Sequence, residues 1–173
     1  LLEISDDFNA TLLDIDLIVC AVPTSGFREI LKSINEINQS APVIWANKGL
    51  EQDSAKLPHE IAIEELGDPK TTNRHWGVVS GPSFAAELVR SLPTALTIAS
   101  TSKEATILAT KFFHHHNLRV YTSDDVVGVS VGGALKNVIA IASGISDGMG
   151  FGNNARAALI TRGLAEISRF GSH

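Results

Sequence analysis

Cysteine and clustered positive charge are both scarce in this sequence. Cys20 is the one cysteine among 173 residues, which excludes an intrachain disulfide framework and favours a reducing compartment. The 14 lysine and arginine residues are dispersed among 19 acidic ones, and the formal net charge is −5. Nucleic-acid-binding proteins usually carry a clustered basic face, so we expect no nucleic-acid partner. Together these features predict a cytoplasmic protein.

Several signatures of catalysis and targeting are also missing. The sequence contains no CxxC pair, no P-loop and no evident pattern of a nucleophile beside a base. Three successive histidines, His114 to His116, invite a metal site, but consecutive side chains point in different directions. We therefore expect solvated polar residues there and no metal. The acidic and polar start of the chain gives no indication of a signal peptide.

Apolar runs and helical patterns alternate along the first 123 residues, in a sequence that is 44% hydrophobic and can bury a core. We expect strands near residues 16–23, 42–48, 76–81, 94–100 and 118–122, and helices near residues 24–39, 55–66, 83–90 and 103–113. The first run is apolar on both faces, as in a covered strand of a parallel sheet, and Cys20 within it should be an inert packed thiol. The alternation predicts an α/β fold: a Rossmann-like, doubly wound layer with right-handed crossovers.

The character of the sequence changes near Asp124. Residues 126–145 contain one charge, Lys136, and four glycines, and residues 153–170 form an amphipathic helical pattern. We therefore place a domain boundary at residues 123–125, between an α/β part (1–123) and the start of an all-α substrate domain (124–173). The apolar run is long enough to cross a bilayer, but a central lysine costs about 2.5–3.5 kcal/mol on insertion scales. We expect a buried core helix and no membrane partner.

Lys136 is the residue that most suggests catalysis. At helical spacing, Gly132 and Gly133 lie one turn before it and Ala140 one turn after it, which leaves space around the lysine stem. In apolar surroundings we expect a buried amine with a lowered pKa, which suits a general acid or base. Asn137 beside it could hydrogen-bond to a polar ligand. The alternative is a structural lysine that reaches solvent or pairs with a carboxylate.

Two further stretches lie where ligands of α/β sheets collect. Lys48 ends an expected strand, and such ligands bind at the carboxyl ends of strands, although an ordinary solvated lysine is the alternative. Residues 81–85 join a strand to a helix. Gly81 permits close backbone approach, and free amides around Ser83 and Ala85 would favour an anion. A tight turn alone explains the same residues equally well.

Six motifs, in order, carry a resemblance to a known family. They are VCAVP (19–23), WANKGLE (45–51), SGPSFAAE (80–87), GVSVGGALKNVIAIA (128–142), SDGMGFGNNAR (146–156) and ITRGLAE (160–166). Together they cover essentially the whole chain, and the last motifs are the most specific. The sequence thereby resembles the bacterial type of NAD(P)-dependent glycerol-3-phosphate dehydrogenase.

The resemblance implies a reaction and a set of site residues. The enzyme would interconvert sn-glycerol 3-phosphate and dihydroxyacetone phosphate by hydride transfer with NAD or NADP, would feed glycerophospholipid synthesis, and would form a homodimer. Lys136 would be the general base at the C2 hydroxyl, and Lys48 would contact both substrate and cofactor. The other implied site residues are Gly81, Ser83 and Asn137 for the substrate and Ala85 for the cofactor.

Parts of the family pattern have no counterpart in these 173 residues. The family's GxGxxG turn in a first βαβ unit, where cofactor preference is also decided, finds no match here, and neither does its later substrate-phosphate arginine. We therefore expect an internal fragment that is inactive alone. Two alternatives remain open: another two-domain NAD(P)-dependent hydroxy-acid dehydrogenase, and a non-catalytic dimerisation module of the same fold. The small neighbours of Lys136 argue against the second.

Overall fold

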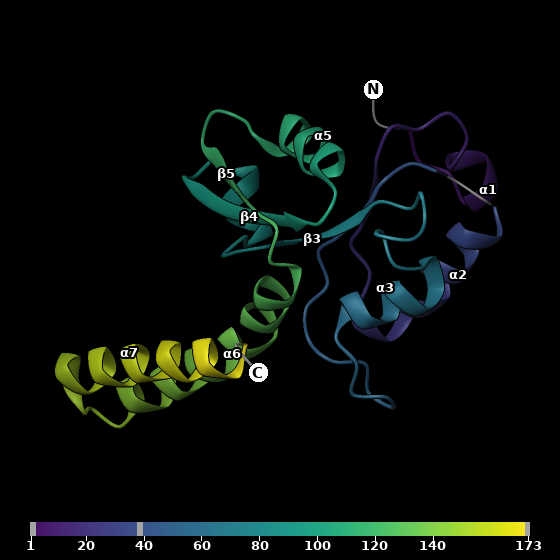
Figure 1. Cartoon of the computed structure of the whole chain (residues 1–173). Helices are drawn as coiled ribbons and strands as arrows, with labels where there is room; N and C mark the ends of the chain where they lie inside the picture. Colours follow the sequence, from purple (N-terminus) through teal and green to yellow (C-terminus); the bar gives the residue numbers. More distant parts are fainter. Residues whose placement is uncertain (1–2, 38–39, 172–173) are drawn as a thin grey trace.

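A five-stranded sheet forms the centre of the computed structural model, which describes residues 3–37 and 40–171 (Figure 1). The strands lie in the order β1-β2-β3-β4-β5, the same as their order along the chain. Their bounds are β1 Ile18–Cys20, β2 Val43–Trp45, β3 Trp76–Ser80, β4 Thr94–Ser100 and β5 Leu118–Ser123. All five expected strands are present, although β1 and β2 are shorter than their apolar runs.

The sheet is mixed, so the crossover expected between each pair of successive strands is absent between β3 and β4. β1, β2 and β3 run parallel, β4 is antiparallel to β3, and β5 is again parallel to β4. The connection from β3 to β4 contains one short helix, α4 (Ala85–Val89), in place of the expected helix at 83–90. Five residues of helix span about 7.5 Å, which is too short to return the chain along the sheet for another parallel strand.

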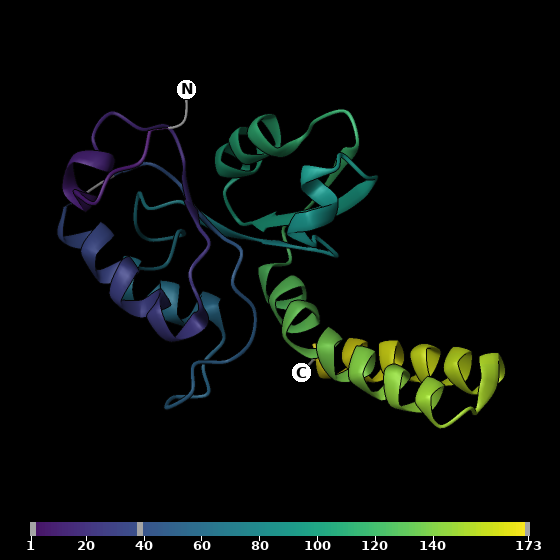
Figure 2. The ribbon, with the colours of Figure 1, turned by 180° about the vertical axis from the view of Figure 1, so that it is seen from behind.

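Helices cover the two faces of the sheet. α2 (Thr24–Glu36) and α3 (Pro58–Leu66) pack on one face and α5 (Lys103–Phe113) on the other, as Figures 1 and 2 show. Successive side chains of β2 alternate accordingly: Val43 and Trp45 join the core under α2 and α3, and Ile44 joins the core under α5. β2 is therefore covered on both faces.

The first strand does not have the double cover expected of it. β1 is an edge strand, and its central Val19 is 48% exposed while Ile18 and Cys20 are buried. Burial raises the pKa of the Cys20 thiol, as expected for an inert packed side chain. A short helix, α1 (Phe8–Thr11), precedes β1 and was not expected.

Two of the expected helices are shorter than their patterns. α3 begins at Pro58 rather than at residue 55, because proline fits the first turn of a helix and its missing amide is not needed there. α2 ends at Glu36, and residues 38 and 39 of the expected helix lie outside the described part of the chain.

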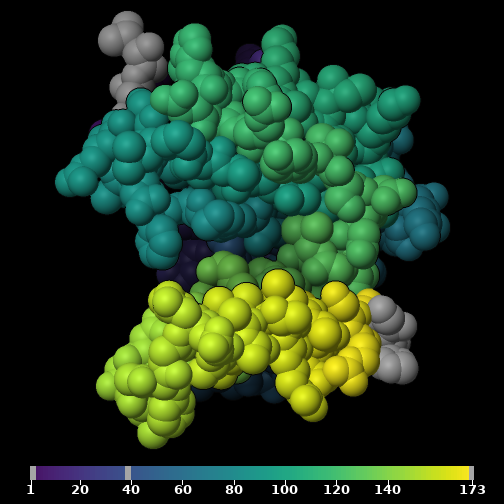
Figure 3. All heavy atoms as spheres, turned by 90° about the vertical axis from the view of Figure 1, so that its left-hand side faces the viewer, coloured from purple at the N-terminus to yellow at the C-terminus, as the bar shows by residue number. Residues whose placement is uncertain are grey.

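α6 (Val126–Gly148) and α7 (Gly152–Phe170) pack against each other as a hairpin that projects from the sheet (Figures 1 and 2). In the space-filling view of Figure 3, α7 is the yellow layer below the rest of the molecule. Both helices were expected, but the expectation of a buried core helix at 126–145 is wrong for the described chain. Only the first turns of α6 pack on the sheet. In the most apolar 18-residue stretch of this helix, 22% of the residues are buried. By length and composition α6 could cross a bilayer, but a single helix of this kind is weak evidence for a membrane protein.

Candidate functional site

The carboxyl ends of β2 and β3 and the first turns of α6 meet at one place. Lys48 lies three residues beyond β2, Ser80 ends β3, and Gly133 lies in the second turn of α6. A Cβ atom built on Gly133 would lie 2.9 Å from Ser80 Oγ and 3.7 Å from Lys48 Cγ. Because glycine has no side chain, α6 approaches both strand ends closely enough to touch the stem of Lys48.

The Lys48 side chain is half-buried and has no carboxylate partner among the described residues. Its ammonium donates a hydrogen bond to the backbone carbonyl of Ala46, with Nζ 3.3 Å from the oxygen. Burial lowers the pKa of Lys48, and the nearby positive charge of Lys136 lowers it further. Neither Lys48 nor Lys136 has an ion pair with a carboxylate of the described chain, and two neighbouring cations of this kind favour an anionic ligand.

Lys136 is exposed, which corrects the expectation of a buried amine. It lies one turn beyond Gly133, at the start of a part of α6 whose residues are mostly exposed. Its ammonium donates a 2.8 Å hydrogen bond to Oδ1 of Asn137, which is also exposed. Lys136 and Asn137, both predicted as site residues, therefore lie together on the part of α6 that follows its contact with Lys48.

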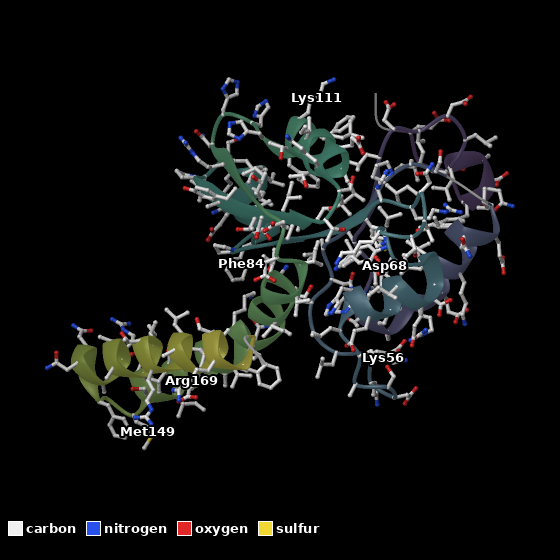
Figure 4. All side chains as sticks on the ribbon, in the orientation of Figure 1. Lys56, Asp68, Phe84, Lys111, Met149 and Arg169 are labelled. Carbon is white, nitrogen blue, oxygen red and sulfur yellow. The ribbon has the colours of Figure 1, made fainter. Side chains whose placement is uncertain are left out.

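The segment after β3 carries the other expected site residues. Gly81 follows Ser80 directly, and a Cβ atom there would lie 2.6 Å from the carbonyl oxygen of Ala95 in β4, so only glycine fits without a shift. Ser83 is half-buried, and its hydroxyl donates a 3.5 Å hydrogen bond to the Gly81 carbonyl. Ala85 begins α4 and is exposed; α4 is too short to provide the helix terminus expected to hold an anion. Phe84, which lies between Ser83 and Ala85 and is labelled in Figure 4, is exposed as well.

Three polar residues at this place were not among the expected site residues. Ser80 and Asn47 are buried at the ends of β3 and β2, and Ser130 is buried on α6 one turn before Gly133. Neither side-chain amide atom of Asn47 has a hydrogen-bond partner within the described chain, and neither does the Ser130 hydroxyl. The position of Asn47 at a strand end was a usable signal, whereas the contact of Ser80 with α6 depends on tertiary packing.

The three successive histidines, expected to be solvated polar residues, are not part of this site. α5 ends at Phe113, and His114 to His116 form the turn between α5 and β5, where His115 bridges to Leu118. The rings of His115 and His116 contact edge to face, with centroids 4.4 Å apart. Within residues 3–37 and 40–171, no group of three metal-ligating side chains is present.

Family profiles match nearly all of the chain. The profile described as the NAD-dependent glycerol-3-phosphate dehydrogenase N-terminus matches residues 1–106, and the corresponding C-terminus profile matches residues 125–173. The chain belongs to the NAD-dependent glycerol-3-phosphate dehydrogenase family. A relative named glycerol-3-phosphate dehydrogenase [NAD(P)+] from Methylobacillus flagellatus is 62% identical over 98% of this chain and 50% of its own length.

Solved structures of glycerol-3-phosphate dehydrogenases have the same fold. The enzyme from Coxiella burnetii matches with a TM-score of 0.84 and 40% identity, over 96% of this chain and 50% of its own. The enzyme from Saccharomyces cerevisiae matches with a TM-score of 0.82 and 31% identity, over 96% of this chain and 49% of its own. The chain therefore spans about half the length of the glycerol-3-phosphate dehydrogenases it matches.

Proposed function

We propose that the intact protein interconverts sn-glycerol 3-phosphate and dihydroxyacetone phosphate with NAD or NADP as the hydride carrier. The observation that carries the proposal is the pair Lys48 and Lys136, two neighbouring cations without a carboxylate partner in the described chain. A phosphorylated substrate supplies the missing negative charge. Family membership supports the same reaction, since the relatives are named for it.

Each site residue takes a role that its position allows. Lys136 is proposed to accept the proton of the C2 hydroxyl as the C2 hydrogen leaves with its electron pair, and to return a proton when the ketone is reduced. Asn137, hydrogen-bonded to that ammonium, would orient it and contact the substrate. Lys48, Gly81 and Ser83 would bind the substrate from the strand ends. Ala85, exposed at the start of α4, would contact the cofactor.

The residues at the strand ends fit a bound dinucleotide. The cofactor would lie along the carboxyl edge of β1 to β3, where Lys48 offers a cation and Asn47 an amide with no protein partner. Bound there, the nicotinamide would supply the acceptor or donor of the hydride. Lys48 would hold negatively charged oxygens, and α6, resting on Gly133, would bring Lys136 to the reacting carbon.

The wider setting of the protein is proposed on the same basis. Residues 1–123 would form the nucleotide-binding part and residues 124–173 the start of the substrate domain, with the boundary between β5 and α6. The protein would act as a homodimer in the cytoplasm and supply glycerol 3-phosphate for glycerophospholipid synthesis.

Replacement of Lys136 tests the proposal. In the intact protein, Lys136→Ala should lower kcat for reduction of dihydroxyacetone phosphate by at least about 100-fold, because a positioned proton carrier contributes about that much. Lys111→Ala serves as the control: it removes an exposed lysine at the far end of α5, distant from α6 in Figure 4. Both variants should keep the parent's melting temperature. A kcat within a few-fold of the parent for Lys136→Ala would return this residue to a structural role.

A further inference from the structure

The segment that carries Lys48 is held by two side chains of α2. Thr24, the first residue of α2, donates a hydrogen bond from Oγ1 to the backbone carbonyl of Lys48 at 3.0 Å. One helical turn later, Arg28 donates from Nε and Nη2 to the two carboxylate oxygens of Glu51, each at 2.8 Å. The first bond fixes the backbone of Lys48 itself, and the second fixes the chain three residues further on.

Arg28 also connects this segment to α3. Its Nη1 lies 2.9 Å from Oε2 of Glu64 and forms a further ion pair with Glu65. The guanidinium is about one-fifth exposed, and its hydrogen bonds hold the pKa of Glu51 at about 2. The planar fork of arginine can serve all of these oxygens at once, which a lysine cannot do. The Arg28 side chain thus connects α2, α3 and the segment after β2.

The chain around Lys48 turns sharply and depends on such ties. Gly49 has a φ of +103°, and beyond it the backbone amide of Glu51 donates to the carbonyl of Lys56 and the amide of Ala55 donates to the carbonyl of Glu51. Before Lys48, the amide of Ala46 is held by the carbonyl of Cys20. Figure 1 shows this segment running beyond the ends of α2 and α3. Without Thr24 and Arg28, the backbone around Lys48 would lose its two side-chain ties to α2, and the ion pair between Lys56 and Glu64 would hold only the far end of the segment.

We infer that Thr24 and Arg28 are positioning residues that set the location of the Lys48 ammonium for a phosphorylated ligand. A lysine side chain has four rotatable bonds, so its affinity for an anion depends on how firmly its backbone is held. Neither α2 residue needs to touch the ligand. The inference rests on the proposed function, in which Lys48 binds the substrate.

The hydroxyl of Thr24 gives the sharper test, because two variants differ in that group alone. Thr24→Val keeps the shape and removes the donor, whereas Thr24→Ser keeps the donor. In the intact protein, Thr24→Val should raise KM for dihydroxyacetone phosphate about five-fold with kcat within about two-fold, as expected for one lost hydrogen bond. Thr24→Ser should stay within about two-fold of the parent in both constants.

Arg28 is tested against a neighbour on the same helix. Arg28→Met should raise KM at least about ten-fold, because charge-assisted, two-pronged hydrogen bonds are stronger than neutral ones. Lys32→Met is the matched control: Lys32 is an exposed α2 residue whose partner, Glu29, lies on the same helix. It should leave KM unchanged. Binding of glycerol 3-phosphate, followed by calorimetry, should weaken in the same order as KM rises.

The outcomes separate this inference from the proposal beneath it. If Lys48→Met raises KM but Thr24→Val and Arg28→Met do not, the positioning role is wrong and the proposed function stands. If Thr24→Val and Arg28→Met lower the melting temperature and leave KM unchanged, the positioning role is also wrong, because both residues then contribute to stability alone. If Lys48→Met leaves KM and ligand binding unchanged, the assignment of Lys48 fails and the inference fails with it.

Discussion

At the scale of single residues, Lys48 has the clearest physical signature. Its replacement by methionine keeps most of the stem and removes the charge, so KM for the phosphorylated substrate should rise about ten-fold or more. The melting temperature should change little, because the ammonium makes one long hydrogen bond to the protein, to Ala46. Lys70→Met, at an exposed lysine in the loop after α3, is the control. Kinetic constants equal to the parent's would remove Lys48 from the site.

The same residue predicts how substrate binding depends on pH. Burial and the charge of Lys136 lower the pKa of Lys48 below its usual 10.5, so its positive charge is lost at a lower pH than that of an ordinary lysine. Affinity for the phosphate should therefore be complete at neutral pH and should fall as pH rises through the lowered pKa. KM measured from pH 7 to 10 should show this alkaline rise in the parent and not in Lys48→Met.

At the scale of elements, the approach of α6 to the strand ends depends on one of two adjacent glycines. A side chain at Gly132 would meet nothing within 4 Å, whereas one at Gly133 would come within 2.9 Å of Ser80 Oγ. Gly132→Ala should therefore raise the free energy of unfolding by about 0.4–1 kcal/mol, the usual gain where the conformation allows alanine.

Gly133→Ala should not show that gain and should also reduce kcat, because α6 must shift away from β3. Adding Ser80→Ala, which removes the obstructing oxygen, should restore part of the loss. Chemical denaturation and steady-state rates of the parent and the three variants measure both effects. Equal stabilisation by the two glycine substitutions would show that α6 does not rest on Ser80.

The elements differ in how far the sequence predicts them. β2 and β3 were predicted from their apolar runs, which are visible without the fold, and every residue of both strands is buried. The antiparallel direction of β4 was not predicted, because an apolar run gives no information on the direction of a strand. The short α4 between β3 and β4 decides that direction. The same limit applies to the site. Lys48 and Gly81 follow strand ends and could be named, but the exposure of Lys136 depends on where α6 leaves the sheet.

At the scale of the whole molecule, the α6–α7 hairpin presents apolar side chains to solvent. The large side chains that are more than half exposed on these helices include Val138, Ile141, Ile145, Leu164 and Phe170. A groove of about 360 Å³ between the helices is lined by Leu135, Ile139, Ile167 and neighbouring residues. A single exposed apolar side chain is ordinary, but several on one hairpin, beside an apolar groove, are typical of an interaction surface.

We therefore predict that the isolated 173-residue chain self-associates at micromolar concentration. Burial of apolar surface contributes about 25 cal/mol per Å². A second copy that covers several of these side chains would therefore gain a favourable free energy of association. Light scattering after gel filtration should give a mass above that of the 18.4 kDa chain. Ile141→Gln and Leu164→Gln, one on each helix, should shift the mass toward the monomer without lowering the melting temperature. Ile63→Gln, at an exposed isoleucine on α3, should not. A monomeric parent at these concentrations, or an equal response to all three substitutions, would show that the hairpin surface does not drive association.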